Sequence, residues 1–360
     1  MTHFKQTLLA TLILSGTFTS AFAQSVWTRH AFPDHFFLYS MTWTGGQLVA
    51  LGDSGLQVGV HIALLTSPNG TTWINRTSTI GVMQSLNSVE WTGSQFVAVG
   101  NGSTVLTSPD GIIWTARNLG TTIRHLGSVA WTGNQIVAIG NDSSGAIVLT
   151  SPNGVTWMSK KFFNFSVPSL IYTGSQLVAV GSFGSISTSP DGVTWVARTS
   201  NVNVDLSSVI WTGNQLVTVG DRGTILTSPD GVTWTARNSG TTSLLNSVTW
   251  TGKQLVAVGN DAVIRTSPDG VAWATRDLVT KDQFISVTWT GSLLVAMGYD
   301  SLSAVTILTS PQDPTPIVPR LSAQNNRKSS ALFTISGKNA DRFKVNGPKA
   351  WVVKPVNISR

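Results

Sequence analysis

Residues 224–234 read Thr-Ile-Leu-Thr-Ser-Pro-Asp-Gly-Val-Thr-Trp, and this stretch decides the fold. The proline of Ser-Pro-Asp-Gly presets φ for a tight turn, and the glycine accepts the positive φ of a hairpin bulge. The segment therefore predicts two short β-strands joined by a turn. Similar segments occupy residues 67–73, 108–114, 151–157, 189–195 and 267–273.

A second motif, an aromatic residue followed by Thr-Gly, lies between these segments. It recurs seven times, 39 to 48 residues apart, at Trp43, Trp91, Trp131, Tyr172, Trp211, Trp250 and Trp289. Each copy ends one predicted strand (A) and leads to the next (B), as in residues 254–259. The Ser-Pro-Asp-Gly turn then joins strands C and D. Four short strands in about 40 residues make one propeller blade. The chain is therefore predicted to be all-β, with a seven-bladed β-propeller over residues 24–310.

The seventh repeat lacks its fourth strand. It stops at Thr309-Ser310-Pro311, with neither the glycine nor the tryptophan that follows elsewhere. At the other end, Val26-Trp27-Thr28-Arg29 resembles the end of a D strand, and Trp27 lies 16 residues before Trp43. We therefore expect residues 25 to 30 to pair with the last blade, which would remove the open sheet edge between the two chain ends.

Two recurring polar positions each have two interpretations. An arginine three residues after the D-strand tryptophan is either an exposed strand end or part of a basic patch. A serine three residues before each A-strand aromatic is better explained as a hydrogen-bonding strand start than as a ligand ring. The arginines are Arg76, Arg117, Arg198, Arg237 and Arg276, and the serines are Ser40, Ser88, Ser128, Ser169, Ser208, Ser247 and Ser286.

The N-terminus has the features of a signal peptide over residues 1–23. Lys5 supplies a positive charge, residues 8–14 a short apolar run, and residues 21–23 a small-x-small cleavage site. We therefore expect a protein that is secreted, periplasmic or at the cell surface. No apolar stretch approaches the length of a membrane span, so no transmembrane segment is expected. The chain contains no cysteine, which excludes thiol chemistry and disulfides.

The C-terminus is predicted to be separate from the propeller. Residues 311–319 form a proline-rich linker, and residues 320–360 form a basic, β-prone extension with nine Lys or Arg and one acid, Asp341. Such charge attracts polyanions, so residues 320–360 are a candidate contact for acidic lipids or glycans. Specific nucleic-acid binding is not expected, because no motif for it is present.

The sequence predicts neither a cofactor nor a metal site. It shows no paired carboxylates, histidine-rich spacing, nucleophile elbow or phosphate loop. His30 and His35 could share a metal ion, but nothing else supports that reading. We therefore expect a protein that is not an enzyme.

Candidate ligand-binding residues lie just upstream of the A strands, where the D–A loops meet the channel mouth. These loops and the B–C loops vary between repeats, whereas the A–B and C–D turns are uniform, and variable loops on a rigid scaffold commonly bind ligands. The alternative is a solvated loop rim. The candidates are Asn87, Arg124, His125, Asp205, Asn246, Asp282 and Gln283.

The Ser-Pro-Asp-Gly-x-Thr-Trp segments resemble the Asp-box of bacterial-neuraminidase-repeat (BNR) propellers. Here the hairpin is one residue shorter, and Asn69 and Asn153 replace the aspartate in two copies. Among such propellers, the sialidases imply an arginine triad, a tyrosine nucleophile with a glutamate partner, and an aspartate acid/base. The tyrosines are Tyr39, Tyr172 and Tyr299, and the single glutamate is Glu90.

Propellers of the photosystem II assembly factor type are also similar in architecture, being exported, repeat-built and non-catalytic. The favoured function is therefore an exported, non-catalytic scaffold that binds a protein or a glycan. The alternative is a sialidase-like glycoside hydrolase with an atypical site, using Asp205 or Asp282 as the acid.

Overall fold

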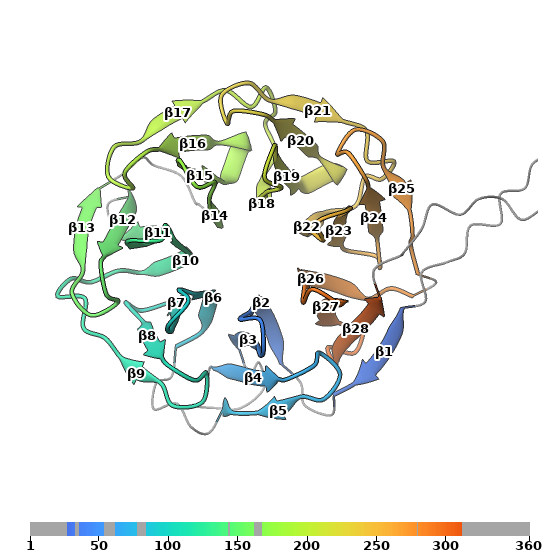
Figure 1. Cartoon of the computed structure of the whole chain (residues 1–360). Helices are drawn as coiled ribbons and strands as arrows, with labels where there is room; N and C mark the ends of the chain where they lie inside the picture. The colour runs from blue at the N-terminus through green and yellow to red at the C-terminus, as the bar shows by residue number, and fades with distance from the viewer. Residues whose placement is uncertain are drawn as a thin grey trace, which may run out of the picture. The chain divides into compact units, whose positions relative to one another are not determined.

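The chain folds as an all-β, seven-bladed propeller, as expected (Figure 1). The computed structural model describes residues 27–32, 36–53, 62–77, 84–142, 145–161, 168–278 and 280–311. The predicted signal peptide, His35, residues 312–319 of the predicted linker and the basic extension lie outside these residues. The propeller falls within one compact unit of the chain, Phe22–Pro316.

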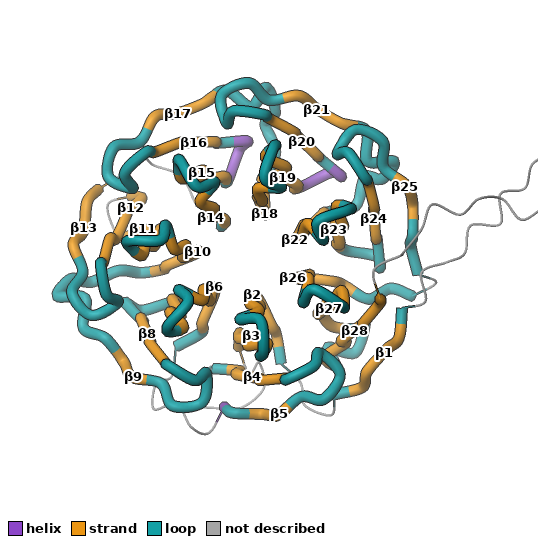
Figure 2. Tube along the Cα trace, in the orientation of Figure 1, coloured by secondary structure: helices purple, strands orange, loops and turns teal. Residues whose placement is uncertain are grey.

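Each blade is an antiparallel sheet of four strands, A to D from the central channel outward (Figures 1 and 2). The A strands are β2 (Phe37–Trp43), β6 (Leu86–Trp91), β10 (His125–Trp131), β14 (Ser169–Tyr172), β18 (Leu206–Trp211), β22 (Leu245–Trp250) and β26 (Gln283–Trp289). The B strands are β3 (Leu48–Asp53), β7 (Phe96–Gly100), β11 (Ile136–Asp142), β15 (Leu177–Val180), β19 (Leu216–Gly220), β23 (Leu255–Gly259) and β27 (Leu293–Tyr299).

The outer strands are shorter on average. The C strands are β4 (Ala63–Ser67), β8 (Val105–Ser108), β12 (Gly145–Ser151), β16 (Ile186–Ser189), β20 (Ile225–Ser228), β24 (Ile264–Ser267) and β28 (Val305–Pro311). The D strands are β5 (Ile74–Asn75), β9 (Thr115–Ala116), β13 (Met158–Lys161), β17 (Val196–Arg198), β21 (Thr235–Arg237), β25 (Ala274–Thr275) and β1 (Thr28–Ala31). Two 3-10 turns, η2 (Ser182–Gly184) and η3 (Asp221–Gly223), join strands B and C in blades 4 and 5.

The ring closes through the N-terminal strand, which confirms the prediction. Strand β1 pairs antiparallel with β28, from Thr28 opposite Thr309 to Ala31 opposite Thr306. The paired residues are Thr28–Ala31, whereas residues 25–30 were expected. The basic residue three positions after Trp27 is His30, whose Nε2 lies 2.8 Å from Thr309 Oγ1. In blade 5, Arg237 Nε donates to Thr227 Oγ1 at 2.9 Å, so His30 takes the place of the repeat arginine.

The apolar core lies between the blades rather than at the centre of the ring. Seven buried clusters each combine side chains of two adjacent blades. Neighbouring residues of one strand serve different clusters, because successive side chains point to opposite faces of a sheet. Val49 packs toward blade 2, for example, while Ala50 packs toward blade 7. This double burial explains why the B strands read as continuous apolar runs.

The A–B and C–D turns share one side of the ring, here called the A–B face, and its turns are nearly identical. In blade 4, Asp191 Oδ1 accepts bonds from the amides of Val193 and Thr194, at 2.8 and 2.7 Å. These bonds lower the pKa of Asp191 to about 2. Gln135 Nε2 donates to the Asp191 carbonyl from the preceding blade at 2.8 Å. Gln95, Gln176 and Gln215 make the same bond to the C–D turn of the following blade.

The recurring serines connect the blades near the channel. Six of them accept a hydrogen bond at Oγ from a backbone amide of the next blade, at 3.1 to 3.4 Å: Ser40, Ser88, Ser128, Ser169, Ser208 and Ser247. The prediction of a hydrogen-bonding role is therefore confirmed, and the bond joins two blades.

Candidate functional site: the B–C face

The B–C and D–A loops lie on the other side of the ring, here called the B–C face, and its backbone differs from that of the A–B face. On the A–B face every described residue with positive φ is a glycine. On the B–C face non-glycine residues also adopt positive φ, which is unfavourable for side chains other than Asn and Asp. All seven described residues of this kind lie here: Ser103, Phe183, Asn201, Arg222, Asp261, Ala262 and Ser303.

Phe183 and Arg222 occupy the same position in the B–C turns of blades 4 and 5. Their φ angles are 57° and 56°. The Phe183 side chain is 75% exposed, and Arg222 is also exposed. The predicted site residue Asp205 supports both turns, since its Oδ1 accepts the Phe183 amide at 2.9 Å and its carbonyl accepts the Asp221 amide at 2.8 Å. Asp205 thus holds the B–C turn that carries Phe183 in place.

Asn87 and Asn246, two other predicted site residues, bind the neighbouring blade. Each sits at a β-bulge of its A strand, where the extra residue redirects the side chain. Asn87 Nδ2 donates to the Leu126 carbonyl at 2.9 Å, and Asn246 Nδ2 donates to the Phe284 carbonyl at 2.8 Å. Both side chains are therefore used in contacts between blades.

His125 and Arg124, in blade 3, lie beside the bond from Asn87 to the Leu126 carbonyl. His125 Nδ1 is 2.8 Å from Asn101 Oδ1 and 3.1 Å from Asn87 Nδ2. Burial lowers the pKa of His125, so its ring is predominantly neutral at pH 7. Arg124 is exposed, and its amide donates to the Asn141 carbonyl at 3.1 Å.

Asp282 belongs to an ion-pair group at the ring closure. Its side chain is buried and lies 3.3 Å from Arg29 Nη1. Arg29 Nη2 also contacts Asp300 at 3.2 Å and Thr306 Oγ1 at 2.8 Å. Burial raises the pKa of Asp282, and the charge of Arg29 only partly opposes this effect. Arg29 thus ties the closing strand to blade 7.

Gln283, a predicted site residue, lies at the channel mouth where blades 7 and 1 meet, in a group whose other members sequence reasoning missed. This mouth cluster consists of Phe37, Tyr39, Asp53, Gln283 and Tyr299. The Tyr299 hydroxyl donates to Gln283 Oε1 at 3.0 Å. The rings of Phe37 and Tyr299 are edge-to-face, with centroids 5.4 Å apart. Burial, then the nearby Asp53 and Tyr299, raise the pKa of Tyr39.

The predicted site residues therefore do not converge on one ligand position. They fall at the blade 2–3, 4–5, 6–7 and 7–1 boundaries around the mouth. The sequence signal for the mouth cluster was available, because Tyr299 stands where other blades have the short polar residues Asp53, Asn101, Asn141, Ser182, Asp221 and Asn260. Its position beside Tyr39 follows only from ring closure.

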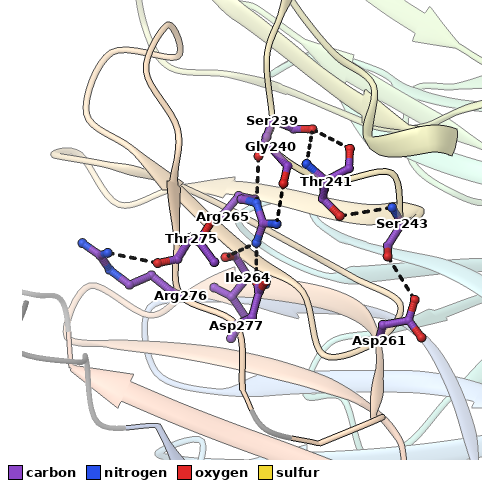
Figure 3. A network of polar contacts seen from close by, with 10 residues as sticks. All are labelled: Ser239, Gly240, Thr241, Ser243, Asp261, Ile264, Arg265, Thr275, Arg276 and Asp277. Carbon is purple, nitrogen blue, oxygen red and sulfur yellow. Dashed lines mark hydrogen bonds and ion pairs between the residues drawn. The ribbon is translucent and has the colours of Figure 1, made fainter.

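A buried arginine at the blade 5–6 boundary was also missed (Figure 3). Arg265 replaces the Leu226 of blade 5 and is 3% exposed. Its Nε donates to the Ser239 carbonyl at 2.8 Å, its Nη2 donates to the Gly240 carbonyl at 3.2 Å, and its Nη1 pairs with Asp277. This network fixes the D–A loop of blade 5 against blade 6.

Two classes of site find no support in the described part of the chain. It contains no group of three or more His, Cys, Asp or Glu side chains that could hold a metal ion. Among the same residues, no helix is long and apolar enough to span a membrane.

Comparisons with known proteins support the fold. The WD40 β-propeller domain of Doa1 superposes with a TM-score of 0.61 at 12% identity, covering 79% of this chain and 95% of that chain. YCF48 bound to D1 peptide gives 0.60 at 18% identity, covering 80% and 97%. The Cps50 (Swd1) propeller of Myceliophteria thermophila gives 0.57 at 11% identity, covering 79% and 99%.

No curated protein sequence matches the chain. Residues 183–285 match the family model of the DUF6242 β-propeller domain. This match covers parts of blades 4 to 7, including the exposed turns of Phe183 and Arg222. The chain is thus similar to DUF6242 propellers in sequence over that segment, and to WD40 and YCF48 propellers in fold.

Proposed function

We propose that this chain is an exported, non-catalytic binding scaffold whose B–C face recognises a protein or glycan partner. The observation that carries the proposal is the gathering of all seven described left-handed, non-glycine residues on that face. A left-handed residue other than Gly, Asn or Asp costs about 1 kcal/mol or more, and five of the seven are of this kind. The same chain uses glycine at every such position of the A–B face, so the side chains of the B–C face are retained despite a conformational cost.

Phe183 is the leading candidate for an anchor residue. A large apolar side chain that is 75% exposed gains little in the free protein, but it would bury substantial apolar area in a partner's pocket. Arg222, at the same position of the next blade, could pair with a carboxylate of the same partner. YCF48 is a propeller that binds a peptide, which agrees with this kind of use for the fold. The resemblance of the C–D turns to Asp-boxes fits the same proposal, since that turn is structural.

Export is part of the proposal and rests on the signal-like residues 1–23. The basic residues 320–360 would add a polyanion contact outside the propeller. Both segments lie outside the described residues, so the proposal for the B–C face does not depend on them.

A glycoside hydrolase is the second candidate. Burial raises the pKa of Asp282, as a general acid requires. However, its carboxylate is paired with Arg29 and its side chain is only 6% exposed. A tyrosine nucleophile would need a lowered pKa, whereas the pKa of Tyr39 is raised. Turnover of fluorogenic glycosides that is lost in Asp282→Asn or Asp205→Asn would favour the hydrolase.

The substitution Phe183→Asn tests the binding scaffold. Asparagine tolerates the left-handed conformation, so the variant should be about 0.5–1 kcal/mol more stable than the wild type. Retention of envelope proteins or arrayed glycans on the immobilised chain should fall at the same time. Thermal melting and quantitative pull-down measure the two effects.

Val193→Asn is the matched control, because Val193 is 38% exposed on a C–D turn of the opposite face. It should leave retention unchanged. Loss of retention in Val193→Asn, with full retention in Phe183→Asn, would place binding on the A–B face and contradict the proposal.

A further inference from the structure

We propose that the A–B face carries a separate binding site where blade 7 lacks its C–D turn, and that this site takes an Asp-Gly or Asn-Gly turn of a partner protein. The site, here called the turn gap, consists of Trp27, Gln254 and Thr266. It lies on the opposite face from Phe183 and Arg222, so it goes beyond the proposed function and does not depend on it.

The complete blades show how two side-chain donors hold one C–D turn. In blade 4, Gln135 Nε2 donates to the Asp191 carbonyl at 2.8 Å, and Trp195 Nε1 donates to the Gly192 carbonyl at 3.0 Å. Blades 3, 5 and 6 repeat both bonds at 2.8 to 3.1 Å. The glutamine always comes from the preceding blade and the tryptophan from the blade itself. The two donors therefore meet at two consecutive carbonyls of one turn.

At blade 7 both donors are present without a turn. Trp27 packs between blades 6 and 7, as the other D-strand tryptophans do at their own boundaries. Its Nε1 is buried and has no acceptor among the described residues. Gln254 is the glutamine of blade 6, and in the same part of the chain it bonds only through its backbone, to Thr251. Trp114 of blade 2 also lacks the indole bond, but its turn is present.

A threonine of blade 6 is uncovered at the same place. In complete blades the turn glycine lies over a C-strand threonine of the preceding blade, and a Cβ on Gly270 would come within 3.3 Å of Thr227 Cγ2. Thr266 is the residue that a turn of blade 7 would cover, and it is partly exposed. The six equivalent threonines are each 5% exposed or less: Thr66, Thr107, Thr150, Thr188, Thr227 and Thr309.

The chain's own C strand leaves the path of the turn. In blade 5 the Ser228 hydroxyl accepts the Gly231 amide at 2.9 Å, which begins the turn. In blade 7 the equivalent Ser310 hydroxyl donates to the Pro311 carbonyl at 3.1 Å, and Pro311 still belongs to β28. Asp313 takes the place of the turn glycine in the sequence, and the proline after it disfavours the φ of 71° to 78° that the six turn glycines adopt. The occupant is therefore assigned to another protein.

The two donors select a bent peptide backbone. Successive carbonyls of an extended strand point to opposite sides, so a strand can serve only one of the donors. A turn with glycine at its second carbonyl serves both, as in blades 3 to 6. The preceding side chain closes such a turn by accepting amides, which Asp191 does at 2.8 Å and Asn153 at 2.9 Å. The turn gap therefore fits a surface loop that contains Asp-Gly or Asn-Gly.

The test uses the peptide Thr-Ser-Pro-Asp-Gly-Val-Thr, the sequence of residues 227–233, with acetylated and amidated ends. The tryptophans of the full chain are labelled with nitrogen-15, and their indole N–H signals are followed by NMR. Trp27 is assigned as the signal that is missing in Trp27→Phe. The peptide should shift this signal downfield and saturably, because the buried indole gains an acceptor. A peptide with alanine in place of the glycine should bind at least fivefold more weakly, roughly the cost of an L side chain at positive φ.

Three substitutions separate the turn gap from other sites. Gln254→Leu should weaken the Kd of the peptide by roughly fivefold, the loss of one hydrogen bond. Leucine suits this position, since blade 7 carries Leu293 there. Gln176→Leu is the matched control, because it removes the same donor from a complete blade and should leave the Kd unchanged. Phe183→Asn on the opposite face should also leave it unchanged.

The proposal is wrong if the peptide does not shift the Trp27 signal, if the alanine peptide binds equally well, or if Gln254→Leu and Gln176→Leu change the Kd equally. Residues 312–316 provide a further check when they are replaced by glycine and serine. A Trp27 signal that moves in this variant without peptide would show that the chain's own segment fills the gap, which also overturns the proposal. Each of these results leaves Phe183-dependent retention on the B–C face unaffected.

Discussion

At the scale of single residues, the least expected group is Glu90, the only glutamate of the chain. It lies on the innermost strand β6, directly before the repeat tryptophan Trp91. The equivalent residues of the other blades are all uncharged: Thr42, Ala130, Ile171, Ile210, Thr249 and Thr288. Burial raises the pKa of Glu90 to about 8. The folded protein therefore holds Glu90 largely as the neutral acid at pH 7.

This shift predicts how stability depends on pH. The folded-state pKa exceeds the ordinary value of 4.5, so the folded protein binds more protons than the unfolded chain between pH 4.5 and about 8. The free energy of unfolding should therefore fall as the pH rises through this range. Glu90→Gln should remove this term, raising the stability by about 1 kcal/mol or more at pH 8, which is a few degrees in Tm.

Melting curves at pH 5 and pH 8 measure the effect. Near pH 5 the difference in Tm between the variant and the wild type should be much smaller than at pH 8, because ionisation of Glu90 in the unfolded chain has only begun to cost stability. An equal gain at both pH values would show that packing rather than ionisation is responsible.

At the scale of structural elements, the buried Arg265 shows how a loop is fixed on one repeat only. The C strands of other blades carry an aliphatic or small residue at this position, and their D–A loops are held by other contacts. Arg265 instead donates to two carbonyls of the blade 5 D–A loop and pairs with Asp277 (Figure 3). Replacing Arg265 leaves the carbonyls of Ser239 and Gly240 without this donor, and leaves Asp277, whose side chain is 34% exposed, without its cation.

Arg265→Leu should therefore destabilise the protein by about 1–2 kcal/mol, although it restores the residue that blade 5 carries. The double variant Arg265→Leu with Asp277→Thr should recover the part of the loss that comes from the unpaired Asp277 carboxylate. Threonine suits position 277, since Thr77 Oγ1 accepts the equivalent C-strand amide, that of Leu64, at 3.2 Å in blade 1. Urea denaturation of the three proteins measures the coupling, and a double variant no more stable than the single one would contradict this account.

At the scale of the whole molecule, stability depends on the short strand β1. Its four residues complete blade 7, and Arg29 adds contacts to Asp282 and Asp300. Removing it exposes the edge of β28 and uncovers apolar side chains that Trp27 packs against.

Deletion of residues 25–31 should accordingly lower the Tm far more than deletion of residues 320–360. Differential scanning calorimetry of the two truncated chains makes the comparison. Arg29→Ala, which keeps the strand but removes the ion pairs, should fall between the wild type and the strand deletion. The reverse order of the two truncations would show that closure by β1 is not what holds the ring together.

The repeat made the fold predictable, whereas the site depends on departures from it. Blade number and closure followed from the spacing of Trp-Thr-Gly and from the missing turn after Pro311. The bounds of the closing strand were less well predicted, since pairing covers Thr28–Ala31 rather than residues 25–30. Asn87 and Asn246 were predicted to face a ligand, but each binds a carbonyl of the next blade. Each lies at a β-bulge that turns its side chain, and the spacing of the repeats does not reveal such a bulge. Tyr39 and Tyr299 lie 260 positions apart in the chain and become neighbours only in the closed ring.

The cluster of apolar residues between blades 7 and 1 has a consequence for how the chain could be rearranged. Linear repeat proteins need specialised caps, because their first and last units each leave one face bare and fray. In this ring every blade has two neighbours, so no unit is terminal and none needs a cap. The order of blades in the gene is then only one of seven equivalent cyclic orders. A chain opened at any other D–A loop should build the same ring, provided that its new first strand can return to complete its last blade.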